Sequence, residues 1–272
     1  MSVPIHFNWV GNRTSLKSAQ IAKCIPQFEF GIRCLELKGK GFLEYQFTSK
    51  MTRNNLWETW PEKAWNSLEA EGQLFPTNNP SFMSSNEIGV NILTWNCRGV
   101  LNPCFRKALL DTLNINSPEI LILTETRLGG DRVAELARSL PFDGFLCTNT
   151  IRFAGGIWIL WKKEAVEVDH MCSTEQENHA SVKVRGSNSL WLLSAIYASP
   201  HKSERRILWE NLKIIAGLHN LPWIMLGDFN DILSCEEKWG GNRPSNSRIR
   251  EFRNCLNDCS MIDLGFLGPK FT

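Results

Sequence analysis

Four apolar stretches of this sequence each end in polar side chains that could take part in chemistry. Asn96 follows ILTW, Glu125 follows LILT, Tyr197 follows LLSAI, and Asp228 and Asn230 follow WIMLG. A single carboxylate at such a place is ordinarily a helix cap or a turn residue. One glutamate, one aspartate and two carboxamides together supply the oxygen ligands that a hard divalent cation such as Mg2+ prefers. The pattern therefore predicts that four strand ends converge on one metal site.

Two local clusters of basic residues lie near these motifs. The first comprises Lys202, Arg205 and Arg206, and the second comprises Arg243, Arg248, Arg250 and Arg253. Such clusters either contact phosphates along a nucleic-acid strand or form solvated helix faces, and the sequence leaves both alternatives open. The residues that we take as candidate nucleic-acid contacts are Lys202, Arg205, Arg206, Arg248 and Arg250.

The composition limits the classes of protein that this chain can represent. Its 272 residues are 43% hydrophobic and 21% charged, with a formal net charge of +2, which is typical of a globular protein with no overall bias toward nucleic acid or membrane surfaces. The longest apolar runs, such as IWILW and WIML, are far shorter than the roughly 18 residues of a membrane span. We therefore expect no membrane association.

The nine cysteines show no Cys-x-x-Cys pair and no zinc-ligand spacing to the five histidines. The N-terminus has no basic stretch followed by an apolar one, as a secretory signal would. Together with the odd number of cysteines, this favours buried or isolated thiols in an intracellular, reducing compartment, either nucleus or cytoplasm.

The elements that must position the polar residues alternate from Val90 onward. The expected strands are VNILTWN, EILILTE, FLCTN, GGIWILWK, AVEVDHM, ASVKVRG, SLWLLSAIYA and PWIMLGD. The expected helices are PCFRKALLDTLN beginning at Pro103, residues 131–139, residues 203–216, and Ser247 to Cys259. Strands joined partly by helices and partly by hairpins predict a layered α/β fold, with sheets inside and helices outside.

The first third of the chain has a different pattern. Residues 1–88 show few sustained apolar periodicities and end in the polar run FPTNNPSFMSSNE, which is typical of a linker. We therefore place a boundary near Glu87. It separates a poorly defined N-terminal segment, residues 1–88, from a domain of residues 89–272.

The motifs NILTWNCRG, LTETRL, IYASP and GDFNDIL resemble, in order and spacing, the endonuclease/exonuclease/phosphatase superfamily, whose fold is the DNase I-like four-layer α/β sandwich. More narrowly, GGIWILWK, RRILWENL, EKWGGNRP and GFLGPKFT are similar to the apurinic/apyrimidinic-type endonuclease domain of plant LINE-type non-LTR retrotransposons. The resemblance covers about residues 90–272. It implies a hydrolase that cleaves phosphodiester bonds in DNA.

The resemblance implies a role for each strand-end residue. Asn96 and Glu125 would belong to the metal site, with Glu125 the principal ligand of Mg2+ or, alternatively, Mn2+. Tyr197 would contact the scissile phosphate. Asp228 and Asn230 would orient or deprotonate the attacking water and hydrogen-bond the phosphate oxygens, as in-line attack on a phosphodiester requires. The resemblance implies DNA as the partner and no protein partner.

One departure from the family pattern shapes the expected activity. In this family the sheet continues past the position of GPKFT and ends in a Ser-Asp-His motif, whereas this sequence ends at Thr272. None of the five histidines replaces that motif by its sequence context, and only His201 lies near a motif residue. We therefore expect a fold that is incomplete on its C-terminal side and an impaired endonuclease. The alternatives are a non-catalytic retroelement remnant that at most binds nucleic acid and a superfamily phosphomonoesterase or deadenylase.

Overall fold

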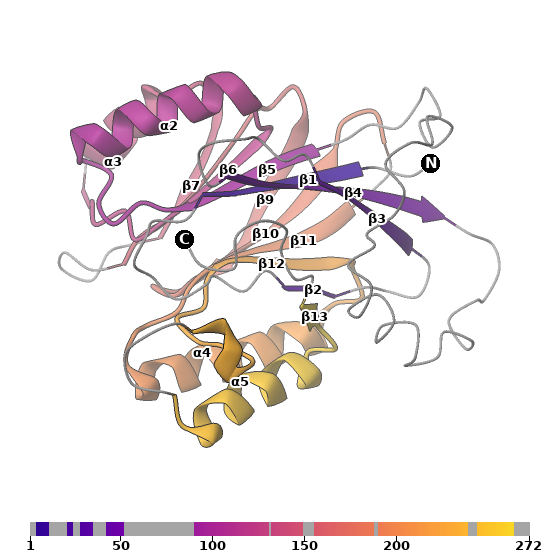
Figure 1. The fold of residues 1–272 in the computed structure, drawn as a ribbon. Coiled ribbons are helices and arrows are strands. Elements are labelled where there is room, and N and C mark those ends of the chain that lie inside the picture. Colours follow the sequence, from indigo (N-terminus) through magenta and orange to yellow (C-terminus); the bar gives the residue numbers. More distant parts are fainter. Residues whose placement is uncertain are drawn as a thin grey trace.

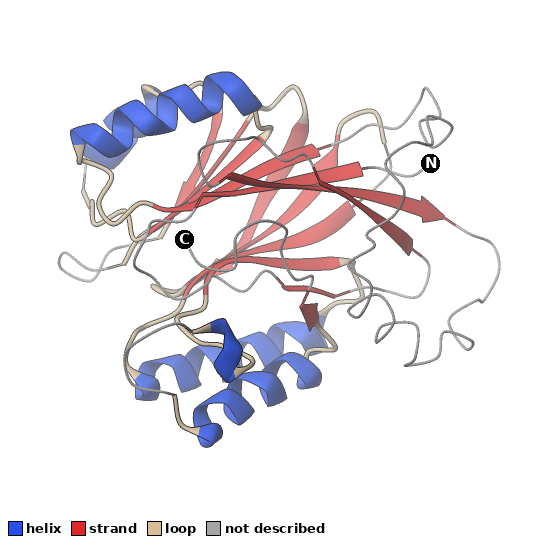
Figure 2. Cartoon of the chain, viewed as in Figure 1, coloured by secondary structure: helices blue, strands red, loops and turns tan. Residues whose placement is uncertain are grey.

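The computed structural model contains two facing β-sheets that lie between two pairs of helices (Figures 1 and 2). It describes the backbone of residues 4–10, 21–23, 28–34 and 42–51, and both backbone and side chains of residues 90–130, 132–148, 155–187, 190–238 and 244–263. Helices α2 and α3 lie on one outer face and α4 and α5 on the other (Figure 1). The order is helices, sheet, sheet, helices, which confirms the α/β four-layer sandwich.

The first sheet has seven strands in the order β3-β4-β1-β5-β6-β8-β7. Its strands are β1 (Pro4–Val10), β3 (Phe28–Cys34), β4 (Phe42–Met51), β5 (Val90–Asn96), β6 (Ile120–Thr124), β7 (Gly144–Cys147) and β8 (Ile157–Trp161). Strand β5 runs parallel to both β1 and β6, and the remaining pairs are antiparallel. The sheet is therefore mixed, with its parallel part at the centre.

The second sheet has six strands in the order β13-β2-β12-β11-β10-β9. Its strands are β2 (Ile21–Lys23), β9 (Val166–Ser173), β10 (Glu177–Val184), β11 (Leu190–Tyr197), β12 (Trp223–Asp228) and β13 (Ile262–Asp263). Only β11 and β12 pair in parallel. The helix α4 connects them, as a parallel crossover requires.

The helices begin where the sequence provides caps. Helix α2 (Pro103–Asn116) starts with proline, and the Asn102 side chain accepts a hydrogen bond from the Cys104 backbone N–H. Helix α5 (Asn246–Asp258) is capped by Ser245 in the same way. The other helices are α3 (Arg132–Arg138), α4 (Lys202–Leu218) and the short 3-10 helix η3 (Cys235–Glu237). No helix within these described ranges is long and apolar enough to span a membrane.

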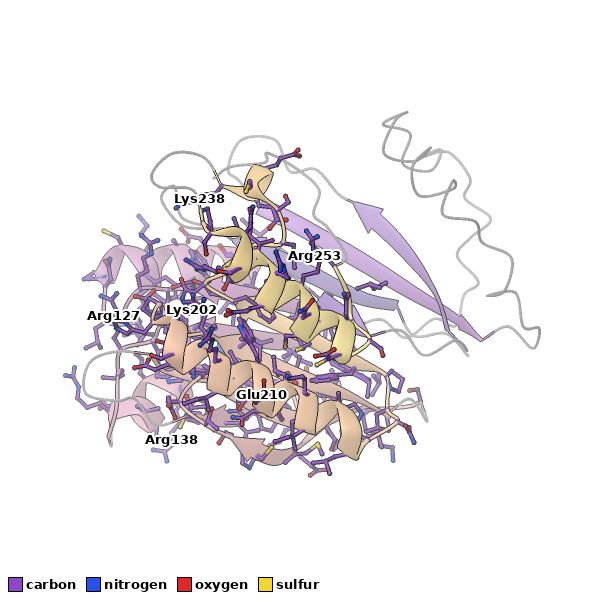
Figure 3. All side chains as sticks on the ribbon, turned by 90° about the horizontal axis from the view of Figure 1, so that it is seen from below. Arg127, Arg138, Lys202, Glu210, Lys238 and Arg253 are labelled. Carbon is purple, nitrogen blue, oxygen red and sulfur yellow. The ribbon has the colours of Figure 1, made fainter. Side chains whose placement is uncertain are left out.

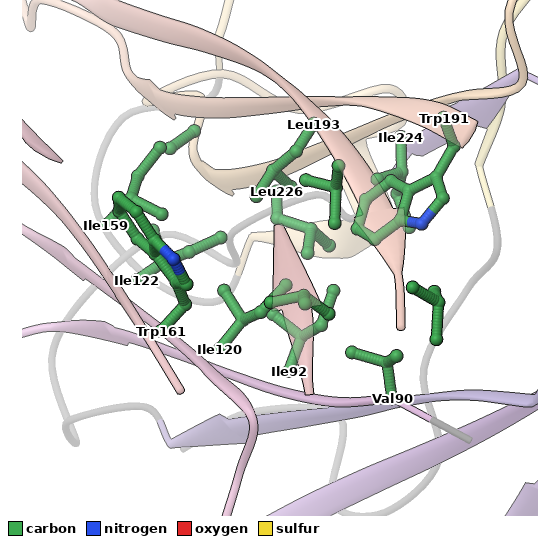
Figure 4. Close-up of a cluster of buried hydrophobic side chains, with 14 of the residues drawn as sticks. Val90, Ile92, Ile120, Ile122, Ile159, Trp161, Trp191, Leu193, Ile224 and Leu226 are labelled. Carbon is green, nitrogen blue, oxygen red and sulfur yellow. The ribbon is translucent and has the colours of Figure 1, made fainter. Parts of the chain in front are cut away.

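Three clusters of buried apolar side chains fill the three interfaces between the four layers. The central cluster lies between the sheets and includes Ile92, Ile122, Leu193 and Leu226 (Figure 4). A second packs α2 and α3 against the first sheet, and a third packs α4 and α5 against the second. Strands with both faces covered read as continuous apolar runs, which explains sequences such as ILILT and IWILW.

The expected elements from Val90 onward are confirmed, with one instructive difference. Strand β10 begins at Glu177, three residues before the expected ASVKVRG, because its first residues are polar yet buried. His179 hydrogen-bonds to Ser194 at 2.6 Å, and Asn211 donates to Glu177 Oε1 at 2.7 Å. Partners of this kind allow polar residues inside a strand that apolar periodicity alone does not detect.

The N-terminal third contributes strands to both sheets through its backbone. Strand β1 pairs with β5, and β2 pairs with β12. The expected linker FPTNNPSFMSSNE and the whole of the motif GFLGPKFT lie outside the described residues. The boundary near Glu87 therefore stays a prediction.

Candidate active site

The parallel pairs β5–β6 and β11–β12 bring the four predicted strand ends to one end of the sandwich. In the first sheet, Asn96 at the end of β5 lies in register with Thr124, and Glu125 follows directly. In the second sheet, Tyr197 at the end of β11 lies in register with Asp228 at the end of β12. Because paired parallel strands point the same way, their carboxyl ends share an edge of each sheet.

A hydrogen bond joins these two edges. Asn96 Nδ2 donates to Asp228 Oδ2 at 2.7 Å, although the residues are 132 positions apart. The other carboxylate oxygen, Asp228 Oδ1, accepts from the backbone N–H of Asn230 at 2.8 Å. Asn230 Nδ2 in turn donates to the Ala198 carbonyl at 2.7 Å, which ties the segment after β12 to the segment after β11.

Burial raises the pKa of two side chains of the site, Asp228 and Tyr197. Burial raises the pKa of Asp228, which is 5% exposed, and the hydrogen bonds from Asn230 and Asn96 oppose that rise. Burial, together with the nearby charges of Glu125 and Asp228, raises the pKa of the Tyr197 phenol. Tyr197 therefore keeps its proton at neutral pH and can donate a hydrogen bond.

Gly227 fixes the distance between β11 and β12 next to the site. Its φ is +140°, and a Cβ at this position would overlap the carbonyl oxygen of Ile196 on β11. Only glycine combines this backbone conformation with such a close approach. The preceding glycine thus holds Asp228 at its place beside Tyr197.

Left-handed backbone conformations gather at the strand ends. The structure records six non-glycine residues with positive φ among those it describes, and four of them belong to these loops: Arg98, Glu125, Arg127 and Asn230. Such conformations are costly for non-glycine residues and persist where the surroundings fix them, which occurs most often at functional sites.

The sequence pattern of the endonuclease/exonuclease/phosphatase family matches residues 93–259, which is more than half of the chain and includes all four strand ends. The chain belongs to this family. No curated protein matches the chain significantly.

Several solved structures are similar to this chain. An AP endonuclease from Leishmania major shares 16% identity at a TM-score of 0.49, covering 62% of this chain and 66% of its own. An AP endonuclease from Archaeoglobus fulgidus shares 13% at 0.47, covering 61% and 69%. A 3′ phosphatase from Neisseria bound to a product DNA hairpin shares 19% at 0.44, covering 61% and 70%. The chain thus spans just under two thirds of the length of the Leishmania protein.

The oxygen atoms proposed as metal ligands lie at the ends of two neighbouring strands of the first sheet, β5 and β6. Glu125 offers a carboxylate that forms an ion pair with Arg127, and Asn96 offers its amide oxygen, which accepts a hydrogen bond from the Arg98 backbone at 3.3 Å. No group of three or more His, Cys, Asp or Glu side chains gathers as a metal site within the described residues. One carboxylate and one amide oxygen still fit Mg2+, which commonly keeps several waters and uses one or two carboxylates.

The five candidate nucleic-acid contacts differ in exposure. Lys202 and Arg206 are exposed on α4 and pair with Glu251, while Arg250 is exposed on α5 (Figure 3 labels Lys202). Arg248 is partly buried against Asp231. Arg205 is 2% exposed and faces inward, so the prediction that it contacts nucleic acid is wrong.

Residues that the sequence analysis did not single out also contact the site. Arg98 and Arg127 each follow a motif residue by two positions, and their charges partly oppose the rise in the pKa of Tyr197. Gln176 accepts from the Tyr197 backbone N–H through its carbonyl and from the Ser199 N–H through its side chain. The position of the two arginines within NCRG and ETR, two residues after Asn96 and Glu125, could have identified them from the sequence. Nothing in the sequence around Gln176 indicates its place beside the site.

His201 lies just before α4 and is exposed, with its backbone N–H donating to Ser199 Oγ at 3.1 Å. His179 is buried within the second sheet. Neither histidine shares a hydrogen bond with the strand-end residues Asn96, Tyr197 or Asp228 among the contacts described for the structured ranges.

Proposed function

We propose that this chain is a divalent-metal-dependent phosphodiesterase that acts on DNA, derived from the endonuclease of a plant LINE-type retroelement. Membership of the endonuclease/exonuclease/phosphatase family supports hydrolysis of a phosphate ester. The motifs GGIWILWK and EKWGGNRP support the retroelement branch by resemblance. An intracellular, reducing compartment fits this origin.

The observation that carries the proposal is the contact between Asn96 and Asp228. It brings a carboxylate whose charge is destabilised by burial next to an amide at the end of the opposite sheet. A carboxylate with a raised pKa is a better proton acceptor than a solvated one, so Asp228 suits the task of orienting a water and removing its proton.

The neighbouring side chains suit a phosphodiester. Tyr197 donates its phenolic O–H to a non-bridging phosphate oxygen, and Asn230 keeps one of its two amide hydrogens for a second oxygen, because the other bonds to Ala198. Glu125 and Asn96 would hold Mg2+. When bound, the metal neutralises negative charge on the phosphate.

The exposed cations make DNA the favoured substrate. Lys202 and Arg206 lie in the first turns of α4, which begins five residues after Tyr197, and Arg250 lies on the adjacent helix. Their side chains can exchange water or a surface carboxylate for DNA phosphates, a mode of binding that carries no sequence information.

The metal assignment is tested by thermal unfolding with and without Mg2+. Binding to the native state raises the melting temperature by mass action, and Glu125→Gln should abolish this rise. Glu135→Gln on the surface of α3 is the matched control and should keep the full Mg2+ response. An undiminished response in Glu125→Gln would refute the metal site.

The reaction is tested by nicking of supercoiled plasmid in Mg2+. The assay compares the 272-residue chain with a form extended by a family segment that ends in Ser-Asp-His, and each form with its Asp228→Asn variant. Nicking that disappears in Asp228→Asn supports the proposal. Release of phosphate from a 3′-phosphorylated oligonucleotide without nicking would favour a phosphomonoesterase, and binding without either reaction would favour a non-catalytic remnant.

A further inference from the structure

A buried arginine on α4 holds the backbone that follows Tyr197. Arg205 is 2% exposed, and its Nη1 donates to the carbonyls of Ser199 and Pro200 at 2.7 and 2.8 Å. These carbonyls belong to the segment between β11 and α4, which also includes Ala198. A guanidinium is planar and presents several donors in fixed directions, so it sets the geometry of the groups that it binds.

The same guanidinium faces a buried carboxylate in the segment after β12. Arg205 Nε lies 3.2 Å from Asp231 Oδ2, and Asp231 is also 2% exposed. From α5, Arg248 Nε donates to Asp231 Oδ1 at 2.8 Å, and Arg248 Nη2 donates to the Asn230 carbonyl. We call these three residues, Arg205, Asp231 and Arg248, the Asp231 bridge.

The Asp231 bridge encloses Asn230. The Asn230 side chain bonds to Ala198, in the segment that Arg205 holds, while the Asn230 carbonyl is held by Arg248. Asn230 has a φ of 44°, a left-handed conformation that the surroundings must maintain. Four separate parts of the chain, α4, α5 and the segments after β11 and β12, thus converge on the position of one amide.

Stability alone is a poor reason for such an arrangement. Removing two or three charges from water costs so much that well-packed apolar residues often replace a buried ion pair with no loss of stability. An apolar cluster cannot supply directed bonds to three backbone carbonyls and one carboxylate. We therefore infer that the Asp231 bridge serves to fix the positions of these groups and not mainly to stabilise the fold.

We propose that Arg205 is a positioning residue that, through the Asp231 bridge and the Ser199–Pro200 carbonyls, holds Asn230 in the orientation needed to contact a phosphate. The inference rests on the proposed phosphodiesterase function for its catalytic meaning. The placement of Asn230 itself is independent of any activity.

The decisive variant is Arg205→Lys. Lysine keeps the positive charge that Asp231 needs, so the melting temperature should stay close to that of the parent chain. The single ammonium of lysine cannot reproduce the several directed donors of the planar guanidinium, so Asn230 should lose its fixed orientation. Lys213→Met is the matched control, because Lys213 also links α4 to α5, through Asp258, but at the other end of the helix.

Two readouts separate positioning from stability. The first is the side-chain amide signal of Asn230 in a 1H–15N spectrum, identified by its loss in Asn230→Asp. The two amide protons should shift and exchange faster with water in Arg205→Lys and stay unchanged in Lys213→Met. The second is plasmid nicking, in which kcat should fall about 100-fold in Arg205→Lys while the Mg2+-induced rise in melting temperature is kept.

The outcomes are distinct. A parent chain that nicks no DNA in any form defeats the proposed function, while the Asn230 signal still decides whether Arg205 positions that residue. An Arg205→Lys protein with unchanged Asn230 signals, or with full activity, overturns the inference. An Arg205→Lys protein that is destabilised as strongly as Arg205→Met also overturns the inference. The guanidinium of Arg205 would then be needed for stability and not for the position of Asn230.

Discussion

Two neighbouring arginines of α4 belong to ion-pair groups with opposite surroundings. Arg205 belongs to the Asp231 bridge, whose central carboxylate is 2% exposed. Arg206 is 60% exposed and joins Lys202 in contacting Glu251 of α5, which we call the Glu251 bridge. Successive helical residues point about 100° apart, so one arginine faces the protein and the next faces water.

The difference teaches what each group of charges can do. In the Glu251 bridge, water solvates the charges whether or not they pair, so pairing changes little. In the Asp231 bridge, loss of one partner leaves a buried charge without compensation. The buried bridge therefore fixes a structure, and the exposed bridge leaves its cations available to other anions.

The largest effect should follow from removal of the buried carboxylate. Asp231→Leu leaves Arg205 buried without a counter-charge, and we expect a loss of about 3–5 kcal/mol in the free energy of unfolding. Urea denaturation measures this loss. Asp258→Leu, which removes the exposed partner of Lys213, is the control and should change stability little. Similar losses in the two variants would contradict the comparison.

A second change should recover much of that loss. In the double variant Arg205→Met with Asp231→Leu, apolar side chains replace the buried pair, and the remaining Arg248 is 27% exposed and can reach water. We expect a stability closer to the parent chain than to Asp231→Leu, with activity still lost, because the directed bonds are absent. A double variant as unstable as Asp231→Leu would show that the bridge stabilises the fold directly.

In DNA binding, we expect the exposed Arg206 to have the larger effect and the buried Arg205 to have none. Arg206→Ala should lower the slope of log affinity against log salt concentration by about 0.9 if Arg206 contacts one phosphate. Arg205→Lys should leave the slope unchanged, because the buried guanidinium does not reach DNA. Fluorescence anisotropy of a labelled duplex at several salt concentrations measures both slopes. Equal changes in the two variants would contradict the assignment of exposed and buried cations.

The smallest effect concerns the Glu251 bridge and pH. Hydrogen bonds from Arg206 and Lys202 lower the pKa of the Glu251 carboxyl to about 2 from its ordinary value of 4.5. A carboxyl with a lowered pKa in the folded state stabilises the protein above its unfolded pKa, and this contribution disappears as pH falls toward 2. Glu251→Gln should therefore slightly lower the melting temperature at pH 7, with a difference that narrows below about pH 4.5. A melting-temperature difference between the parent chain and Glu251→Gln that widens in acid would contradict this prediction.

The sequence predicted the strand ends well because each follows a mostly apolar run, as at Asn96 and Asp228, and neighbouring parallel strands place such ends together. It did not separate Arg205 from Arg206, since both were taken as exposed cations. The buried stripe of α4 includes Leu208, Leu212 and Ile215, and Arg205 lies on it, whereas Ile207 and Ile214 are exposed. A charged residue on a buried stripe needs a partner, but Asp231 lies in a distant segment that helical spacing cannot reveal.

Gly227 and Asp228, the first two residues of GDFN, should be conserved for different reasons among related chains. Replacing Gly227 forces a side chain into the backbone of β11, so every descendant that keeps this sheet is under pressure to keep the glycine. Burial raises the pKa of Asp228 and so disfavours its charge, although hydrogen bonds from Asn96 and Asn230 oppose this effect. Among related chains, conservation of Gly227 would therefore indicate selection for the fold, and conservation of Asp228 would support the proposed role in hydrolysis.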